Sequence, residues 1–281
     1  MTIGDLLKAA SAELAAAGLE GALREARLLM AEAAGLDRGA IFAHPERELD
    51  GATAARFTGM VARRARREPM AHILGRREFW SLSFRVTADT LDPRPDSEAL
   101  VQAVLDQVSD RAGPLRLVDF GTGTGCLLLA LLHELPAARG LGVDISEAAL
   151  SVARANAAAL RLDSRVAFQR SNWDDGIDPV FDILVSNPPY IPGSEVAALQ
   201  PEVAQFEPRL ALDGGSDGLA AYRRLAPAAM RLLAAHGLAA FEIGAGQSES
   251  VVRIMEEGGL RHIATAADLA GIPRCVLFRK R

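Results

Sequence analysis

The sequence predicts an α/β protein in which a small bundle of helices precedes an open, mostly parallel sheet. Helical periodicity runs from Gly4 to about Arg67, whereas strand-like and helical stretches alternate from Leu115 onward. Such alternation is typical of a parallel sheet whose strands are joined by helices. A chain of 281 residues can form one large or two medium domains, and the change of pattern favours two.

The first segments place apolar residues on one face of a helix. Two stripes recur at helical spacing: Leu6, Leu7, Ala10 and Leu14, and then Leu23, Ala26, Leu29, Met30 and Ala33. Residues that end helices separate these segments: Gly18, Gly21, Gly35 and Pro45. The pattern predicts a bundle of short helices. The arginines that close it, Arg63, Arg64, Arg66 and Arg67, are interpreted as a solvated helix face rather than a binding patch.

A hairpin is predicted between the two domains. The stretch EFWSLSFRVT, Glu78 to Thr87, alternates and is rich in aromatic and β-branched residues, as in a pair of short strands. A proline-stiffened loop, LDPRPDSEAL, follows and leads into a helix from about Ser97 to Val108.

Seven strand signals then alternate with helices. The strands are LRLVDFG, GLGVDIS, RVAFQR, FDILVSN, GLAAFEIG, RHIATA and RCVLFRK. The helices expected between them are Cys126 to Leu135, Glu147 to Leu160, Leu219 to Ala235 and Ser248 to Glu257. Only a short DLAGIP segment separates the last two strands, which predicts an antiparallel hairpin at one edge of the sheet.

Composition excludes several classes of protein. A net charge of −5, with 49% hydrophobic residues, describes an ordinary globular chain and gives no global sign of nucleic-acid binding. Cys126, Cys275 and five scattered histidines show no metal-ligand spacing, so no metal is expected. No stretch approaches the length of a membrane span. We expect a reduced, cytoplasmic protein that does not bind membranes.

A glycine-rich turn follows the first strand of the predicted sheet. Gly121, Gly123 and Gly125 permit a tight turn and close backbone approach to a ligand, although GxGxG differs from the dinucleotide spacing. Asp144 ends the next strand, where a carboxylate can accept hydrogen bonds from both ribose hydroxyls. Its alternative role is to cap the next helix, which Ser146 could also do. Two adjacent strand ends favour a nucleoside-like cofactor.

Two further strand ends carry unusual residues. Trp173 follows the third strand between polar residues, where an indole could cover a flat heterocycle instead of filling the core. The fourth strand stops at Asn187-Pro188-Pro189-Tyr190. Prolines have no backbone N–H, so this segment offers acceptors without competing donors. It reads as a rigid site for a small hydrogen-bond donor.

These motifs together resemble those of S-adenosylmethionine-dependent methyltransferases that modify amide-like or exocyclic nitrogens. More of the chain is similar to the bacterial peptide chain release factor glutamine methyltransferases, in four stretches: PMAHILGRREFW from Pro69, LDPRPDSE from Leu91, FEPRLALDGGSDGLAAY from Phe206 and FEIGAGQ from Phe241. The resemblance covers nearly the whole chain. It implies a Rossmann-like, seven-stranded class I methyltransferase domain in residues 91–281, after a helical bundle in 1–75 and a hairpin linker in 76–90.

The resemblance also implies an activity. Such enzymes methylate the side-chain nitrogen of the glutamine in the Gly-Gly-Gln motif of class I release factors, using S-adenosylmethionine and leaving S-adenosylhomocysteine. The release factor would be the partner, docked with help from the helical bundle, and no nucleic acid would be methylated. The side-chain oxygen of Asn187 and the carbonyl of Pro188 would accept hydrogen bonds from the two N–H groups of the glutamine amide, and Tyr190 would pack against that amide.

Site residues carry over position by position. Those at the cofactor would be Gly121, Thr122, Gly123, Thr124, Gly125, Asp144, Trp173 and Asn187; those at the glutamine would be Asn187, Pro188, Pro189 and Tyr190, of which Asn187, Pro188 and Tyr190 would be catalytic. Two positions depart from the family pattern. Asn172 stands where an aspartate is common, although an amide oxygen can also accept a hydrogen bond from adenine. Asp92 replaces a commoner apolar residue before Pro93.

Two other functions fit part of the pattern. An adenine-N6 DNA or RNA methyltransferase could hold its base amine in the same kind of pocket, but the acidic charge and the lack of a basic target-reading domain oppose this. A non-catalytic, ribosome-associated binding module could keep the fold alone. The intact Asn187-Pro188-Pro189-Tyr190 segment argues against that module, because a site without a reaction is free to lose its acceptors.

Overall fold

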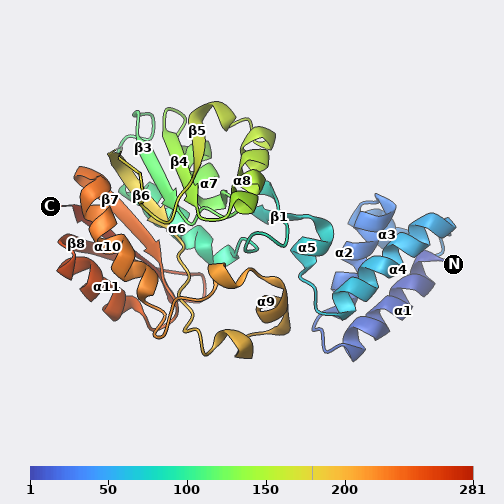
Figure 1. Ribbon diagram of the computed structural model, residues 1–281. Helices are drawn as coiled ribbons and strands as arrows, with labels where there is room; N and C mark the ends of the chain where they lie inside the picture. Colours follow the sequence, from blue (N-terminus) through green and yellow to red (C-terminus); the bar gives the residue numbers. More distant parts are fainter. Residues whose placement is uncertain (179, 281) are drawn as a thin grey trace. The chain divides into compact units, whose positions relative to one another are not determined.

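The computed structural model describes residues 1–178 and 180–280, which fall into two units (Figure 1). The first unit consists of Met1–Gly75 together with Gln200–Phe206, and the second holds the remaining described residues. Gln200–Phe206 lies within the span that was expected to belong wholly to the methyltransferase domain. The chain therefore crosses between the units three times.

The regular elements of the first unit are helices, with one isolated antiparallel β-bridge between Thr2 and Glu48. Its helices are α1 (Ile3–Ala16), α2 (Ala22–Ala34), α3 (Arg38–Ala43), α4 (Gly51–Ala65), α5 (Met70–Leu74) and α9 (Pro201–Phe206). The side chains of Thr2, Asp37 and Asp50 accept backbone N–H groups at the starts of α1, α3 and α4, which satisfies donors that a helix leaves unpaired.

The apolar stripe of α2 differs by one residue from the prediction. Leu23 is 42% exposed, and Ala22 instead joins Ala26 and Leu29 in the core. Ala22 is aligned with Leu29, and Leu23 with buried Met30, by the same i, i+7 spacing, so helical spacing alone does not distinguish Ala22 from Leu23. Leu23, which belongs to the apolar stripe predicted for this helix, is therefore not part of the core.

The arginine cluster is also not a simple solvated face. Arg64 is 6% exposed and its guanidinium binds Glu25 (Nε–Oε2, 2.7 Å) and Glu202 of α9 (Nη1–Oε1, 3.1 Å). Arg67 contacts the other oxygen of Glu202 at 2.8 Å. Burial acts against the charge of Arg64, but the two carboxylates outweigh it and raise its pKa. Only Arg66 of the four is exposed.

The second unit begins with the predicted hairpin. β1 (Arg76–Phe79) pairs antiparallel with β2 (Leu82–Arg85) around a two-residue turn. Trp80 and Ser81 both have positive φ, 52° and 58°, as such a turn requires. Two carboxylates hold Trp80 in place: Glu98 accepts its backbone N–H at 2.8 Å and Glu134 accepts its indole N–H at 2.9 Å.

Seven strands form the sheet of the second unit. They are β3 (Arg116–Phe120), β4 (Arg139–Asp144), β5 (Val166–Arg170), β6 (Phe181–Ser186), β7 (Leu233–Glu242), β8 (Leu260–Ala267) and β9 (Pro273–Lys280). Their order is β5-β4-β3-β6-β7-β9-β8, with β9 antiparallel to both neighbours. The predicted edge hairpin is therefore confirmed. The strand order reverses beside β3, which is where open α/β sheets bind their ligands.

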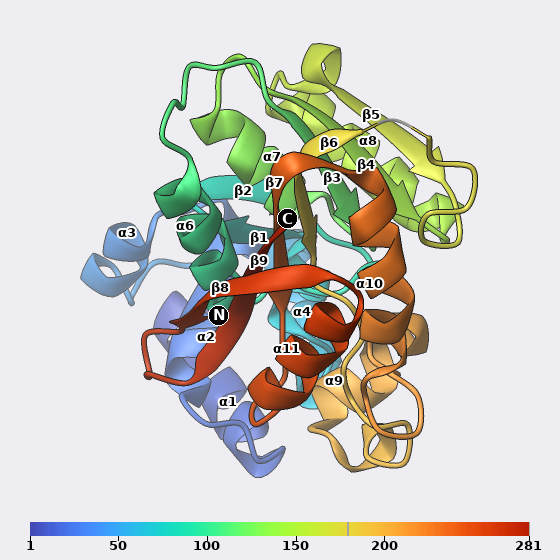
Figure 2. The same cartoon turned by 90° about the vertical axis from the view of Figure 1, so that its left-hand side faces the viewer.

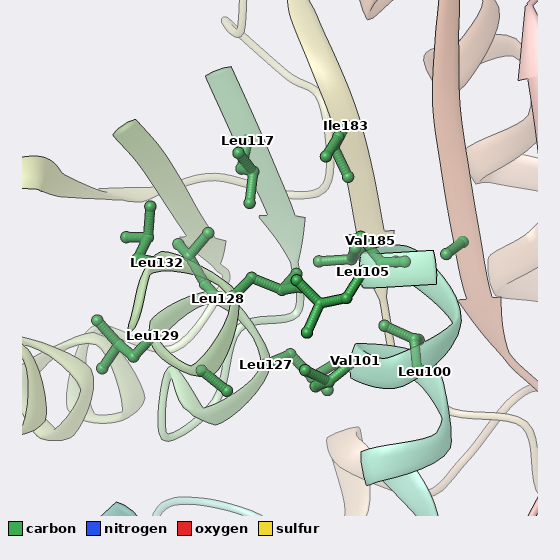
Figure 3. Packing of buried hydrophobic residues seen from close by; sticks show 14 of the residues in the cluster. Leu100, Val101, Leu105, Leu117, Leu127, Leu128, Leu129, Leu132, Ile183 and Val185 are labelled. Carbon is green, nitrogen blue, oxygen red and sulfur yellow. The ribbon is translucent and has the colours of Figure 1, made fainter. Parts of the chain in front are cut away.

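Helices cover both faces of this sheet, as Figure 2 shows for α6 and α7 on one side and α10 on the other. These helices are α6 (Glu98–Gln107), α7 (Cys126–Glu134), α8 (Glu147–Ala159), α10 (Ala220–Leu232) and α11 (Ser248–Glu257). Neighbouring residues of β3 serve different cores: Leu117 packs with α6 and α7, and Val118 with α10 and α11. Figure 3 shows leucines of α7 beside Leu117 and Val185.

Strand pairing corrects one predicted boundary. Leu219 to Ala235 was expected to be helical, yet α10 ends at Leu232 and β7 begins at Leu233, which pairs with Phe181 of β6. Pairing with a neighbouring strand is a long-range interaction that overrides local helical periodicity. Within the described ranges, no helix has both the length and the apolar character needed to cross a membrane.

Candidate active site

A cavity of about 430 Å³ opens where β3, β4 and β6 end. Its walls include the turn after β3, Asp144 at the end of β4 and Asn187 directly after β6. The segments 89–94 and 208–214 line it from outside the sheet. Parallel strands thus bring residues that are far apart in sequence to one edge, as the motif positions predicted.

The turn after β3 is built by glycine geometry. Gly121, Gly123 and Gly125 all have positive φ, between 53° and 81°, a conformation that other residues rarely adopt. The backbone N–H groups of Gly121 and Thr122 both donate to Val143 O of β4, at 2.8 and 2.9 Å. No atom lies within 4 Å of a Cβ built on Gly121, so a side chain there would occupy the cavity itself. The turn leaves room for a ligand against its backbone.

Asp144 faces this turn from β4. Its Oδ2 accepts the N–H of Gly123 and its Oδ1 accepts the N–H of Ser146, each at 2.9 Å. The helix cap that was its alternative role belongs to Ser146, whose hydroxyl accepts the N–H of Ala149. A carboxylate has about four acceptor positions, so Asp144 can still accept two hydroxyl groups from the cavity.

Trp173 lies at the rim of the cavity and also touches the core. It lines the cavity together with Asn172 and packs against the apolar residues beneath α10. Its φ of 56° is unusual for an aromatic residue and places it in a tight turn after β5. Asn172 is exposed, so its amide is accessible from solvent.

Several hydrogen bonds fix the segment after β6. Ser186, fully buried, donates from its hydroxyl to Phe120 O at 2.6 Å, and Ile191 pairs with the loop around Asp213. Gln247 donates from Nε2 to Tyr190 O at 2.9 Å. A Cβ on Gly218 would lie 2.3 Å from Tyr190 O, so only glycine fits there. The segment is held from three directions.

Of the predicted site residues, most line this one cavity: Gly121, Thr122, Gly123, Thr124, Asp144, Trp173, Asn187 and Pro189. Gly125, Pro188 and Tyr190 are not among its lining residues. Gly125 packs instead beside Leu129 of α7, and Pro188 is buried. Burial, followed by the nearby Glu242 carboxyl, raises the pKa of Tyr190 to about 12, so its hydroxyl stays protonated.

Three buried acids near the site were missed in the sequence. Asp119 of β3 accepts the Thr122 hydroxyl at 2.7 Å, and Glu207 accepts the N–H of Asp92 at 3.2 Å. Glu242 ends β7 beside Asn187. Burial raises the pKa of each to about 7. Glu207 and Glu242 each had a signal, as the second residue of the FEPRLALDGGSDGLAAY and FEIGAGQ stretches, whereas Asp119 appeared only as part of a predicted strand.

Asp92, one of the two departures from the family pattern, has a defined place. It is 5% exposed, lines the cavity, and faces Arg77 with 3.8 Å between Oδ1 and Nε. Glu207, which accepts its backbone N–H, also contacts Arg94 at 3.4 Å. Asp92 therefore belongs to a network of two acids and two arginines, of which Asp92 and Arg94 line the cavity.

Sequence comparison identifies relatives over the full length of the chain. A release factor glutamine methyltransferase of Rhodospirillum rubrum is 46% identical over 281 residues, covering 100% of this chain and 86% of that protein. One from Caulobacter vibrioides is 44% identical over 278 residues, covering 99% and 96%.

The chain belongs to the release factor glutamine methyltransferase family. Two family models match parts of it: "PrmC N-terminal domain" over residues 5–75 and "Methyltransferase small domain" over residues 87–216. The fold is that of methyltransferases in general: the crystal structure of a methyltransferase from Pyrococcus furiosus superposes with a TM-score of 0.51 at 15% identity, covering 71% of this chain and 89% of that one. The predictions of the family and of the fold are both confirmed. The roles of the individual site residues stay predictions.

Proposed function

We propose that this chain transfers a methyl group from S-adenosylmethionine to the side-chain amide nitrogen of the glutamine in the Gly-Gly-Gln motif of class I release factors. The observation that carries the proposal is the shared cavity, in which the glycine turn, Asp144 and Asn187 meet. Cofactor-binding and acceptor-binding residues must face one space, because the methyl group passes directly between the two molecules.

The residues around the glycine turn fit the cofactor. The open space above Gly121 admits a ligand against the backbone, and the free acceptor positions of Asp144 suit two ribose hydroxyls. Trp173 and Asn172 at the rim suit the flat adenine and its amino group. When bound, S-adenosylmethionine supplies an electrophilic methyl carbon. The chain itself binds and orients both molecules.

Asn187 would orient the glutamine amide. An amide nitrogen is a poor nucleophile because its lone pair is delocalised into the carbonyl, and its N–H bonds become more acidic as that pair is withdrawn. An acceptor oxygen on Asn187 would therefore bind the transition state more tightly than the ground state. Pro189 lines the same cavity. Pro188, as second acceptor, and Tyr190, as packing surface, are assigned these roles by family resemblance alone.

The partner would be a whole release factor, whose glutamine lies on a loop that reaches into the cavity. The helical unit would help to dock the rest of that protein, because binding energy away from the reacting group secures the substrate.

One labelling experiment tests the proposal. The chain is incubated with methyl-labelled S-adenosylmethionine and either a purified release factor, the same factor with its Gly-Gly-Gln glutamine replaced, or adenine-containing DNA. Label should enter the intact factor only. Labelling of DNA at a comparable rate would favour the adenine-N6 function, and labelling of neither substrate would favour a binding module.

A further inference from the structure

The FEIGAGQ stretch lies directly behind the segment that carries Asn187. Phe241 of β7 is paired with Ser186 of β6, so the next residues along these parallel strands, Glu242 and Asn187, are neighbours. Glu242 is 2% exposed and does not line the 430 Å³ cavity. A buried carboxyl beside the proposed acceptor residue cannot touch a substrate in that cavity, but it can act on Asn187.

One hydrogen bond shows which end of the Asn187 amide faces the protein. Asn187 Nδ2 donates to Ser97 Oγ over 3.3 Å. Ser97 and Asn187 lie close enough to the Glu242 carboxyl to oppose the rise of its pKa, and the buried Oε2 of that carboxyl has no hydrogen-bond partner among the described residues. An ionised carboxylate only accepts hydrogen bonds, so groups that turn toward it must present N–H or O–H.

We infer that Glu242 is a positioning residue for the methyl-transfer reaction: it holds the Asn187 amide with Nδ2 toward the protein and Oδ1 toward the cavity. The inference rests on the proposed function, in which Oδ1 of Asn187 accepts a hydrogen bond from a substrate N–H group. If the amide turned over, Nδ2 would meet the substrate N–H, and two donors facing each other repel. The two orientations of an asparagine amide have nearly the same shape, so packing alone does not select one of them. The carboxylate selects the orientation that presents Nδ2 to it.

The surroundings of Glu242 suit this role. Burial raises its pKa to about 7, opposed by hydrogen bonding from Ser97 and by the charge of Arg274. Other titratable groups interact with it, namely Asp96, Tyr190, Tyr222, Cys126 and Cys275. Arg274 is the cation whose charge acts on Glu242, and its own ion pairs are with Asp96 at 3.2 Å and Asp268 at 2.8 Å. The carboxyl retains acceptor capacity for Asn187 and Ser97.

The test is Glu242→Gln, which keeps the shape and adds a donor. Its NH₂ group can donate to Asn187 Oδ1 and so stabilise the inverted amide. We expect kcat with a release factor to fall about 10-fold or more, with little change in the Kd of S-adenosylmethionine. In the background of Asn187→Ala, Glu242→Gln should have almost no further effect, because a positioning residue acts only through the group that it positions.

A second measurement does not depend on turnover. In protein labelled with ¹⁵N-asparagine, the side-chain NH₂ signals of Asn187 are those that vanish in Asn187→Ala. Glu242→Gln should shift them, whereas the matched variant Glu134→Gln, which alters a carboxylate bonded to Trp80 outside the cavity, should leave both these signals and kcat unchanged. Unshifted signals, or an equal loss of kcat in the Asn187→Ala background, would overturn the inference. Absence of methylation by the unmodified chain would instead refute the proposed function, and the NMR result would still decide the position of Asn187.

Discussion

Two sets of acids, one in each unit of the chain, have their pKa values shifted in opposite directions. In the helical unit, Arg63 lowers the pKa of Glu68, and for Glu202 the arginines Arg67 and Arg64 outweigh the opposing effect of burial. In the methyltransferase unit, burial dominates and raises the pKa values of Asp119, Glu207 and Glu242 to about 7. Glu68 and Glu202 are only partly buried and each contacts an arginine, whereas Asp119, Glu207 and Glu242 are buried beside the cavity, where burial outweighs the groups that oppose it.

The direction of the pKa shift distinguishes acids that stabilise the fold from acids that serve binding or catalysis. Paired charges in the helical unit hold helices together, and breaking one pair leaves an uncompensated buried charge. Unbalanced acids are costly to bury, and such groups concentrate where a protein binds or reacts. Variants of the first kind should therefore change folding alone, and variants of the second should change binding or turnover more than folding.

The largest expected effect is on turnover, from Asn187→Ala. Removal of one preorganised acceptor should reduce kcat by about 10²-fold or more, or on the order of 3 kcal/mol of barrier. Cofactor affinity, measured by calorimetry, should change far less because the glycine turn and Asp144 remain. A parallel loss of cofactor affinity and melting temperature, with near-normal turnover of the folded fraction, would make Asn187 a structural residue.

A comparable change in stability is expected from Arg64→Met. Glu25 and Glu202 would lose their shared buried cation, which should lower the free energy of unfolding of the helical unit by about 3 kcal/mol. Both tryptophans, Trp80 and Trp173, belong to the other unit. Circular dichroism should therefore report an early transition that tryptophan fluorescence does not share.

The control for that variant is Arg56→Met. Arg56 pairs with Glu32 at 3.3 Å but its side chain is 58% exposed, so its loss should cost less than about 1 kcal/mol. If the two variants melted alike, the buried network around Arg64 would contribute no more than a surface pair.

Asp144→Ala should weaken cofactor binding. Loss of two hydrogen bonds from ribose hydroxyls to a charged acceptor corresponds to about 2 kcal/mol, or roughly 30-fold in Kd. The matched control is Asp182→Ala, because Asp182 accepts the N–H of Arg116 at 2.8 Å at the opposite end of the strands. Equal Kd values for Asp144→Ala and the unmodified chain would show that the ribose assignment is wrong.

The smallest effect concerns pH. An acid whose pKa is higher in the folded than in the unfolded state keeps its proton to a higher pH when folded. For Glu242, the free energy of unfolding should therefore fall as the pH rises from 4.5, the ordinary pKa of a glutamate, through about 7, the raised pKa in the folded protein. Between pH 6 and 8 each such acid should cost about 1 kcal/mol. Denaturant titrations followed by tryptophan fluorescence should show this loss, and Glu242→Gln should reduce it. A slope unchanged by that variant would contradict the assignment.

Local patterns in the sequence were sufficient to predict the sheet and the cavity. Strand composition, glycine spacing and the proline pair after β6 are properties of consecutive residues, and parallel pairing then brings Gly121, Asp144 and Asn187 together. What could not be predicted depends on distant partners. Ser97 contacts Asn187 across 90 positions of sequence, and Glu202 contacts Arg64 across 138. Neither contact leaves a periodicity that a single sequence reveals.

The return of Gln200–Phe206 to the helical unit has a consequence for modularity. The unit is not an appendage that can be added to or removed from one end of the chain, because part of it is encoded within the methyltransferase segment. A fragment that begins at Arg76 would keep α9 but lose Arg64 and Arg67, the two cations of Glu202. A transplant of the first 75 residues onto another methyltransferase would likewise lack α9. Exchange of the helical unit between relatives should therefore succeed only when Met1–Gly75 and Gln200–Phe206 are exchanged together.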